Sequence, residues 1–173
     1  MDEIAGDRVV IEGVSFHSAV LARNLAKIHR VFAYVATCGR EVDDWSHREP
    51  DVFISLWLDM IKEMILRDAQ SQFRARLCER YALTKISGMS PGSGNMDVWP
   101  IAQQAPLFAL IGGVTEDTGV QLKESFLMIP TKSVSGVLFP TEVPFYSCML
   151  CSRPHCIGRR APYDPASFPN THP

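Results

Sequence analysis

Residues 120–139 read VQLKESFLMIPTKSVSGVLF, and the predicted architecture is built outward from them. Phe126 and Met128 alternate along the first half, while Ser133 to Phe139 is a second apolar run that stops at Pro140. Alternation and β-branched residues are typical of strands, and proline cannot donate a ladder hydrogen bond inside a sheet. The stretch therefore predicts two strands that lead directly into the segment after residue 145.

That segment, Tyr146–Tyr163, reads YSCMLCSRPHCIGRRAPY and holds three of the five cysteines of the chain. Cys148, Cys151 and Cys156 have the spacing C-x2-C-x4-C. Thiolates must be clustered where several sulfurs bind one metal ion from about 2.3 Å away. The spacing predicts an iron–sulfur cluster, with zinc as one alternative and three reduced, unliganded thiols as another.

Three cysteines do not complete a four-coordinate site, so a metal here needs a fourth ligand. The candidates are an exogenous group and four side chains: His155, Cys78, Cys38 and His172. Arg153, Arg159 and Arg160 lie beside the cysteines in the sequence, and cations favour the thiolate form that binds metals. The charge pattern of the loop 146–163 therefore agrees with a metal centre.

Upstream of these strands, residues 87–94 read SGMSPGSG. Three glycines and a proline predict a loop whose backbone can approach a ligand closely. Leu83 to Ile86, just before it, reads as a short strand. Pro100 begins a predicted helical pair that Gly112 and Gly113 end, because proline suits a first helical position and glycine a C-terminal cap.

The N-terminal half predicts an edge strand at Val9–Ile11, a helix from Ser15, a central strand at 31–38 and a long helix at 51–81. In the long helix, apolar residues recur at every third or fourth position, which predicts a face packed on the core. Its members are Ile54, Trp57, Leu58, Ile61, Met64, Ile65, Ala69, Phe73 and Leu77.

The totals favour one domain over residues 1–163, followed by a proline-rich tail, 164–173. The net charge of −2 gives no basic face, so nucleic acid is not an expected partner. No apolar run approaches the roughly 18 residues of a membrane span, and the acidic N-terminus lacks a signal peptide's basic start. We therefore expect a cytoplasmic protein without a membrane partner, whose thiols stay reduced.

Several short motifs follow one another in a fixed order. They are SPG at residues 90–92, WP at 99–100, LF at 107–108, GVxLxES at 119–125 and MxPxKSVSG at 128–136. In this order they resemble the activation (reactivation) domain of vitamin B12-dependent methionine synthase. The likeness is greatest to stand-alone activation-domain proteins with a cysteine-rich C-terminus, and it covers about Leu83 to Phe139.

The resemblance implies an α+β fold with a twisted antiparallel sheet and flanking helices. In the family this domain binds S-adenosylmethionine and caps a corrinoid, cobalamin, that another domain holds. The cobalt, oxidised to Co(II), is then reduced by one electron and methylated. The implied contacts to the cofactor or the methyl donor are Ser90, Pro91, Gly92, Lys132, Ser133, Ser135 and Gly136, and Arg159 and Arg160 are available to a carboxylate or phosphate.

The sequence departs from the family in the loop that reads Arg-x-x-Pro-Gly-Tyr. The arginine, which reaches the methyl donor, corresponds to Gly88, and the tyrosine, which lines the site, corresponds to Ser93. Recognition of a carboxylate calls for a cation, so we expect Lys85 or Arg40 to replace the arginine. The family's acidic contact from the long helix corresponds to residues 68–72.

Three functional hypotheses follow. The first is an accessory protein for the reductive activation of a corrinoid protein or corrinoid methyltransferase, with the cluster at Cys148, Cys151 and Cys156 supplying a low-potential electron. The second is a non-catalytic module or chaperone that binds a metal or the corrinoid itself. The third is a domain that retains only the fold of a larger methionine synthase, because fold alone does not carry function.

Overall fold

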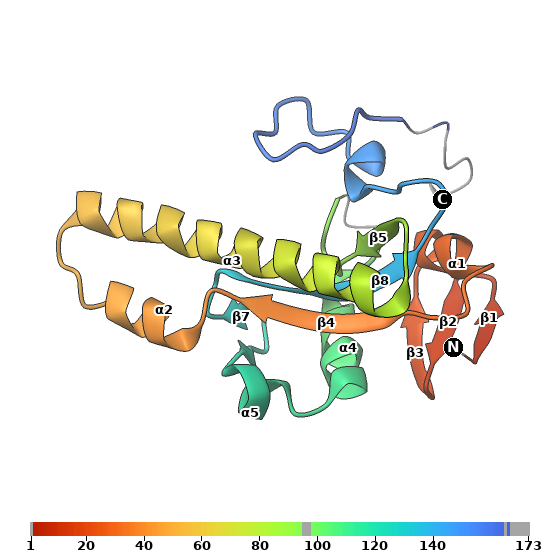
Figure 1. The fold of residues 1–173 in the computed structure, drawn as a ribbon, viewed down its shortest axis with the longest axis horizontal. Coiled ribbons are helices and arrows are strands. Elements are labelled where there is room, and N and C mark those ends of the chain that lie inside the picture. The colour runs from red at the N-terminus through yellow and green to blue at the C-terminus, as the bar shows by residue number, and fades with distance from the viewer. Residues whose placement is uncertain (1, 95–97, 165, 167–173) are drawn as a thin grey trace.

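The computed structural model describes residues 2–94, 98–164 and 166 (Figure 1). Its central antiparallel sheet has the order β4–β8–β5, with strands at Phe32–Thr37, Ser133–Pro140 and Ile86–Met89. Three helices flank this sheet, with α3 on one side and the other two on the opposite side: α3 (Val52–Tyr81), α4 (Gln104–Ile111) and α5 (Val114–Thr118). The predicted α+β fold, an antiparallel sheet with flanking helices, is confirmed.

Strand β8 lies in the middle of this sheet, and its two neighbours pair with different lengths of it. β4 pairs with β8 from Ser133 to Leu138, whereas β5 pairs only from Val137 to Pro140. Within the described ranges, the half of β8 at Ser133–Gly136 therefore has no strand on its β5 side. The predicted strand at 31–38 is confirmed as β4, but it is an edge strand and not the central one.

A second sheet, β1–β2–β3, and helix α1 form one end of the molecule (Figure 1). Their bounds are Glu3–Ala5, Arg8–Ile11, Val14–His17 and Ala19–Leu25. The predicted start of this helix at Ser15 is wrong, because Ser15 lies in β3. The helix itself is present as α1 and begins after Ser18, whose Oγ accepts a hydrogen bond from the Leu21 amide at 2.9 Å. The edge position predicted for Val9–Ile11 is also wrong, since β2 is the middle strand.

The long helix α3 is confirmed, and local signals explain both its ends. Asp51 is the N-cap, and its Oδ1 accepts hydrogen bonds from the amides of Phe53 at 2.8 Å and Ile54 at 3.1 Å. Such a cap satisfies amides that have no partner in the first helical turn. At the other end Ala82 adopts a left-handed conformation with φ of 52°, which ends the helix.

Only the second half of α3 packs on the sheet. There Phe73 and Leu77 contact Tyr34 and Leu138. The first half projects beyond the sheet beside α2, Arg40–Ser46 (Figure 1). The prediction that its whole apolar stripe is core is therefore wrong, because most large apolar side chains of this half are exposed and Leu58 is buried. The exposed ones are Val52, Phe53, Ile54, Leu56, Trp57, Met60, Ile61, Met64 and Ile65.

The main core lies between the N-terminal sheet, α1, α4 and β8. Trp99 and Phe16 are fully buried there and meet edge to face, with ring centroids 5.9 Å apart.

The predicted helical pair after Pro100 appears as a short 3-10 helix, Ile101–Gln103, followed by α4, which ends at Gly112. The single strand predicted over residues 120–130 is instead a hairpin of two short strands, β6 (Gln121–Leu122) and β7 (Met128–Ile129).

The glycine-rich segment at 87–94 is only partly a loop, because its first three residues belong to β5. The irregular part begins at Ser90. After β8, a second 3-10 helix at Ser147–Leu150 opens the cysteine-rich segment. No helix in the described part of the chain combines the length and the apolar character that crossing a membrane requires.

Candidate functional site

A cavity of about 540 Å³ lies where β5 ends, beside the half of β8 that has no strand on that side. It is lined by the loop at 90–93, by α3, by β8 and by the cysteine-rich segment. Seven of the residues that the sequence predicts as a site line it together: Ser90, Pro91, Gly92, Ser133, Ser135, Cys148 and Arg160. We refer to this cavity as the edge pocket.

The β8 side of the edge pocket is polar and closely packed. Ser133 Oγ lies 2.7 Å from the carbonyl oxygen of Pro130, and Ser135 Oγ donates to Gln104 Oε1 at 3.2 Å. Gly136 stands where the loop crosses the sheet, because a Cβ there would overlap the carbonyl oxygen of Met89. The glycine of the KSVSG motif thus allows the SPG loop to lie against β8.

The α3 side is formed by Leu66, Gln70 and Arg74, which are four residues apart and share one face of the helix. Arg74 reaches strand β5: its Nη2 lies 3.1 Å from the position that a Cβ on Gly88 would occupy. No described residue lining the pocket is acidic, while Arg74 and Arg160 are cationic. The edge pocket is therefore suited to a ligand with a negative group.

The substitute cations expected from the sequence lie elsewhere. Lys85 lines a different cavity, and Arg40 Nε is 3.6 Å from Asp44 Oδ2. In the 68–72 range, Gln70 lines the edge pocket, while Asp68 accepts a hydrogen bond from Gln72 Nε2 at 2.6 Å. Sequence reasoning missed Arg74, and the available signal was its place on the same helical face as Gln70.

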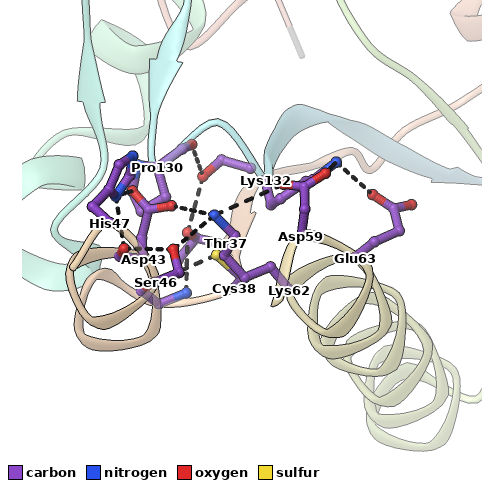
Figure 2. Close-up of polar contacts among 12 residues, drawn as sticks. Thr37, Cys38, Asp43, Ser46, His47, Asp59, Lys62, Glu63, Pro130 and Lys132 are labelled. Atoms are coloured by element: carbon purple, nitrogen blue, oxygen red, sulfur yellow. Dashed lines mark hydrogen bonds and ion pairs between the residues drawn. The ribbon is translucent and has the colours of Figure 1, made fainter. Parts of the chain in front are cut away.

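Lys132, also predicted to contact the cofactor, lies in a separate cluster (Figure 2). Its Nζ is 2.9 Å from Asp59 Oδ2 and 3.9 Å from Glu63 Oε2, both on α3. The hydrogen bond to Asp59 raises the pKa of Lys132 above its ordinary value. This lysine therefore ties the start of β8 to the projecting half of α3, and it does not line the edge pocket.

The same view contains a buried ion pair between α2 and α3 (Figure 2). Lys62 Nζ donates to Asp43 Oδ1 and to Ser46 Oγ, each at 3.0 Å. Cys38 is buried beside them, and burial, followed by the charge of Asp43, raises the pKa of its thiol. A raised thiol pKa keeps Cys38 in the neutral, unreactive form at neutral pH.

The cysteine-rich segment is closed around Arg159. Its guanidinium donates to the carbonyl oxygens of Cys148 at 3.1 Å, Cys151 at 3.1 Å and Ala161 at 3.3 Å, and also to that of Arg153. The sulfur of Cys148 accepts a hydrogen bond from the Arg160 amide at 3.4 Å. A cation with five donors thus satisfies the backbone of the loop.

The three cysteines do not meet in this conformation. Across the described residues, no group of three or more His, Cys, Asp or Glu side chains is placed to hold a metal ion. Among the predicted fourth ligands, Cys38 lies in the cluster of Figure 2, Cys78 lies on α3 and His155 is exposed. His172 lies outside the described residues. The donor set as arranged here does not fit a metal or an iron–sulfur cluster.

Together, the fold and the edge pocket define a small α+β domain with a cavity at the open edge of its antiparallel sheet. The family model described as "Vitamin B12 dependent methionine synthase, activation domain" matches residues 68–155, which is 88 of the 173 residues. The chain belongs to this family. No curated protein matched the chain.

The match spans the second half of α3, the SPG loop, β8 and two of the three clustered cysteines, Cys148 and Cys151. The predicted site residues Cys156, Arg159 and Arg160 lie beyond it. Membership gives the chain a role in the reductive activation of a corrinoid enzyme, with a corrinoid protein as its partner.

Proposed function

We propose that the edge pocket binds S-adenosylmethionine and presents its methyl group to the corrinoid of a separate protein or domain. The observation that carries the proposal is that the two motifs of the family resemblance, SPG at 90–92 and SVSG at 133–136, line or border one cavity. Its volume, about 540 Å³, lies within the range of small-molecule sites.

The proposed reaction needs a reductant besides the methyl donor. An external one-electron donor reduces the partner's cobalt from Co(II) to Co(I). The methyl group then passes from the sulfonium sulfur to the cobalt as the carbon–sulfur bond breaks, and S-adenosylhomocysteine leaves. The chain itself contributes binding and orientation, which convert a bimolecular encounter into a positioned one.

The residues that line the edge pocket would contact the methyl donor from two sides. The backbone at Ser90–Gly92 and the hydroxyls of Ser133 and Ser135 contact the donor from the sheet side. Tyr146, Cys148, Gly158 and Arg160 enclose it from the cysteine-rich segment. Arg160 is exposed and available to a carboxylate or phosphate.

An iron–sulfur cluster, or zinc, at Cys148, Cys151 and Cys156 remains a prediction of the spacing, and we draw no electron-transfer step from it. It is tested by preparing the protein without oxygen and measuring iron, zinc and acid-labile sulfide. The cluster predicts bound iron and sulfide that Cys151→Ala loses and that Ser152→Ala, which removes no thiol from the same loop, keeps. A colourless, metal-free protein after reconstitution removes the metal centre from the proposal.

A second candidate function is a non-catalytic module that holds the corrinoid or assists its loading. It is favoured by Gly88 and Ser93, which stand where the resemblance implies the arginine and tyrosine of the methyl-donor site. In that case the protein binds the partner or its corrinoid but not the methyl donor. The retention of the fold without either activity is the third possibility.

Titration calorimetry with S-adenosylmethionine separates these functions. We expect micromolar binding by the unaltered protein, and loss of it in Ser93→Trp, which fills the pocket beside the SPG loop. Ser152→Trp, on an exposed residue outside the pocket, is the matched control and should bind normally. No binding at millimolar donor would exclude the activation proposal and favour the module.

A further inference from the structure

We infer that Arg74, on α3, is the residue that binds the anionic group of the pocket's ligand. That the ligand is S-adenosylmethionine, and its anionic group the carboxylate, rests on the proposed function. The role of Arg74 rests on the position of its guanidinium and on its charge.

The guanidinium of Arg74 lies in the space that a side chain at residue 88 of β5 would occupy. A Cβ at Gly88 would lie 3.1 Å from Arg74 Nη2 and 2.7 Å from Leu138 Cδ2. Both contacts are closer than ordinary van der Waals packing, so a side chain at residue 88 would displace the guanidinium or Leu138. Glycine at 88 and arginine at 74 are therefore coupled: the cation enters the pocket from the helix because strand β5 carries no side chain at residue 88.

The charge of Arg74 is not balanced by the protein around it. Within residues 2–94, 98–164 and 166, no carboxylate pairs with its guanidinium and no group accepts a hydrogen bond from it. The residue is half-buried, and a partly desolvated charge without a partner is unfavourable. An oxyanion that accepts two parallel N–H bonds relieves this cost.

The neighbours of Arg74 hold it in position before a ligand arrives. Phe73 packs against Tyr34 with ring centroids 5.7 Å apart, and Leu77 is buried against Leu138. Both contacts fix the turn of α3 that carries Arg74 on the sheet. A cation on such a rigid element loses less entropy on binding than one on a loop. Arg160, from the cysteine-rich segment, is a second cation at the same pocket.

The test compares S-adenosylmethionine with its decarboxylated analogue in two variants of the full chain. Arg74→Gln removes the charge in the pocket, and Arg76→Gln removes an equal charge from an exposed position of the same helix. We expect Arg74→Gln to bind S-adenosylmethionine about 10–100-fold more weakly and the decarboxylated analogue unchanged. Arg76→Gln should leave both affinities unchanged. Arg74→Lys, which keeps the charge but not the planar fork, should fall between.

Each result decides the inference. An equal loss for both ligands, or no loss in Arg74→Gln, overturns it and leaves the proposed function intact. If the unaltered protein does not bind S-adenosylmethionine, the proposed function fails, and methionine and inorganic pyrophosphate serve as carboxylate and phosphate probes. Binding of either that depends on Arg74 then supports the inference, and binding of neither overturns it.

Discussion

Lys62 Nζ lies 3.0 Å from Asp43 Oδ1, and the two side chains are only 8% and 5% exposed. Ser46 Oγ accepts a second hydrogen bond from the ammonium group, so the buried charge is well satisfied (Figure 2). This pair joins α2 to the part of α3 that projects beyond the sheet. The two projecting helices are therefore joined by buried polar contacts.

Breaking this pair should be more costly than replacing it. Asp43→Ala leaves a buried ammonium without its carboxylate, so we expect a loss of about 3–5 kcal/mol in the free energy of unfolding. The double variant Asp43→Leu with Lys62→Met removes both charges and should recover most of that loss. Urea unfolding of the three proteins measures both quantities. A double variant no more stable than Asp43→Ala would contradict the explanation.

Gly136 should not tolerate even a methyl group. Its Cβ would overlap the carbonyl oxygen of Met89 and lie 2.7 Å from Ser90 Oγ, so Gly136→Ala pushes the SPG loop off β8. We expect a loss of about 1–3 kcal/mol, typical of overpacking, together with weaker ligand binding. Gly158→Ala is the matched control for stability only, because no atom lies within 4 Å of its Cβ position but the residue itself lines the edge pocket. Thermal unfolding that is equal in the two variants would refute the close approach.

Arg159 should control the order of the cysteine-rich segment. Arg159→Ala removes the donors to four carbonyl oxygens, so we expect faster hydrogen exchange at residues 147–161 and little change in β8. Arg153→Ala removes an exposed side chain and keeps the carbonyl that Arg159 contacts, which makes it the control. If both variants exchange like the unaltered protein, Arg159 does not organise the loop.

The Lys132–Asp59 pair should stabilise the fold in a pH-dependent way. The pKa of Lys132 is raised in the folded protein, so its contribution is fully present below the ordinary lysine pKa and is lost as pH rises through the folded value. Because Asp59 is 48% exposed, we expect only about 0.5–1 kcal/mol from Lys132→Met at pH 8. The difference between the two proteins should shrink in high salt and at strongly alkaline pH. A difference that grows with pH would contradict the sign.

The sequence predicts best the features that local chemistry specifies. The regular apolar spacing after Asp51 predicts α3, and the run ending at Pro140 predicts β8. The helix start was misplaced at Ser15 because the short strand β3, which leads into α1, imitates helical spacing. Local pattern alone does not distinguish the two.

The local sequence pattern could not predict contacts between residues that lie far apart in the chain. Arg74 and Gly88 are fourteen positions apart in the sequence, and only the packing of α3 on the sheet brings the guanidinium to β5. The exposure of Trp57 and Met64 likewise depends on where the sheet ends, which helical periodicity does not encode. The cysteine spacing is a local signal, but whether the three sulfurs meet is a property of the loop's conformation.

The edge pocket has walls of unequal stiffness. Its sheet side is fixed by ladder hydrogen bonds and a close glycine contact, whereas the segment at 146–160 is closed largely by one guanidinium. We therefore expect a ligand to enter and leave through movement of that segment, while the strands keep their register. The cysteine-rich segment would then set the rate of exchange at the pocket as well as the part of the affinity that comes from Tyr146, Cys148 and Arg160.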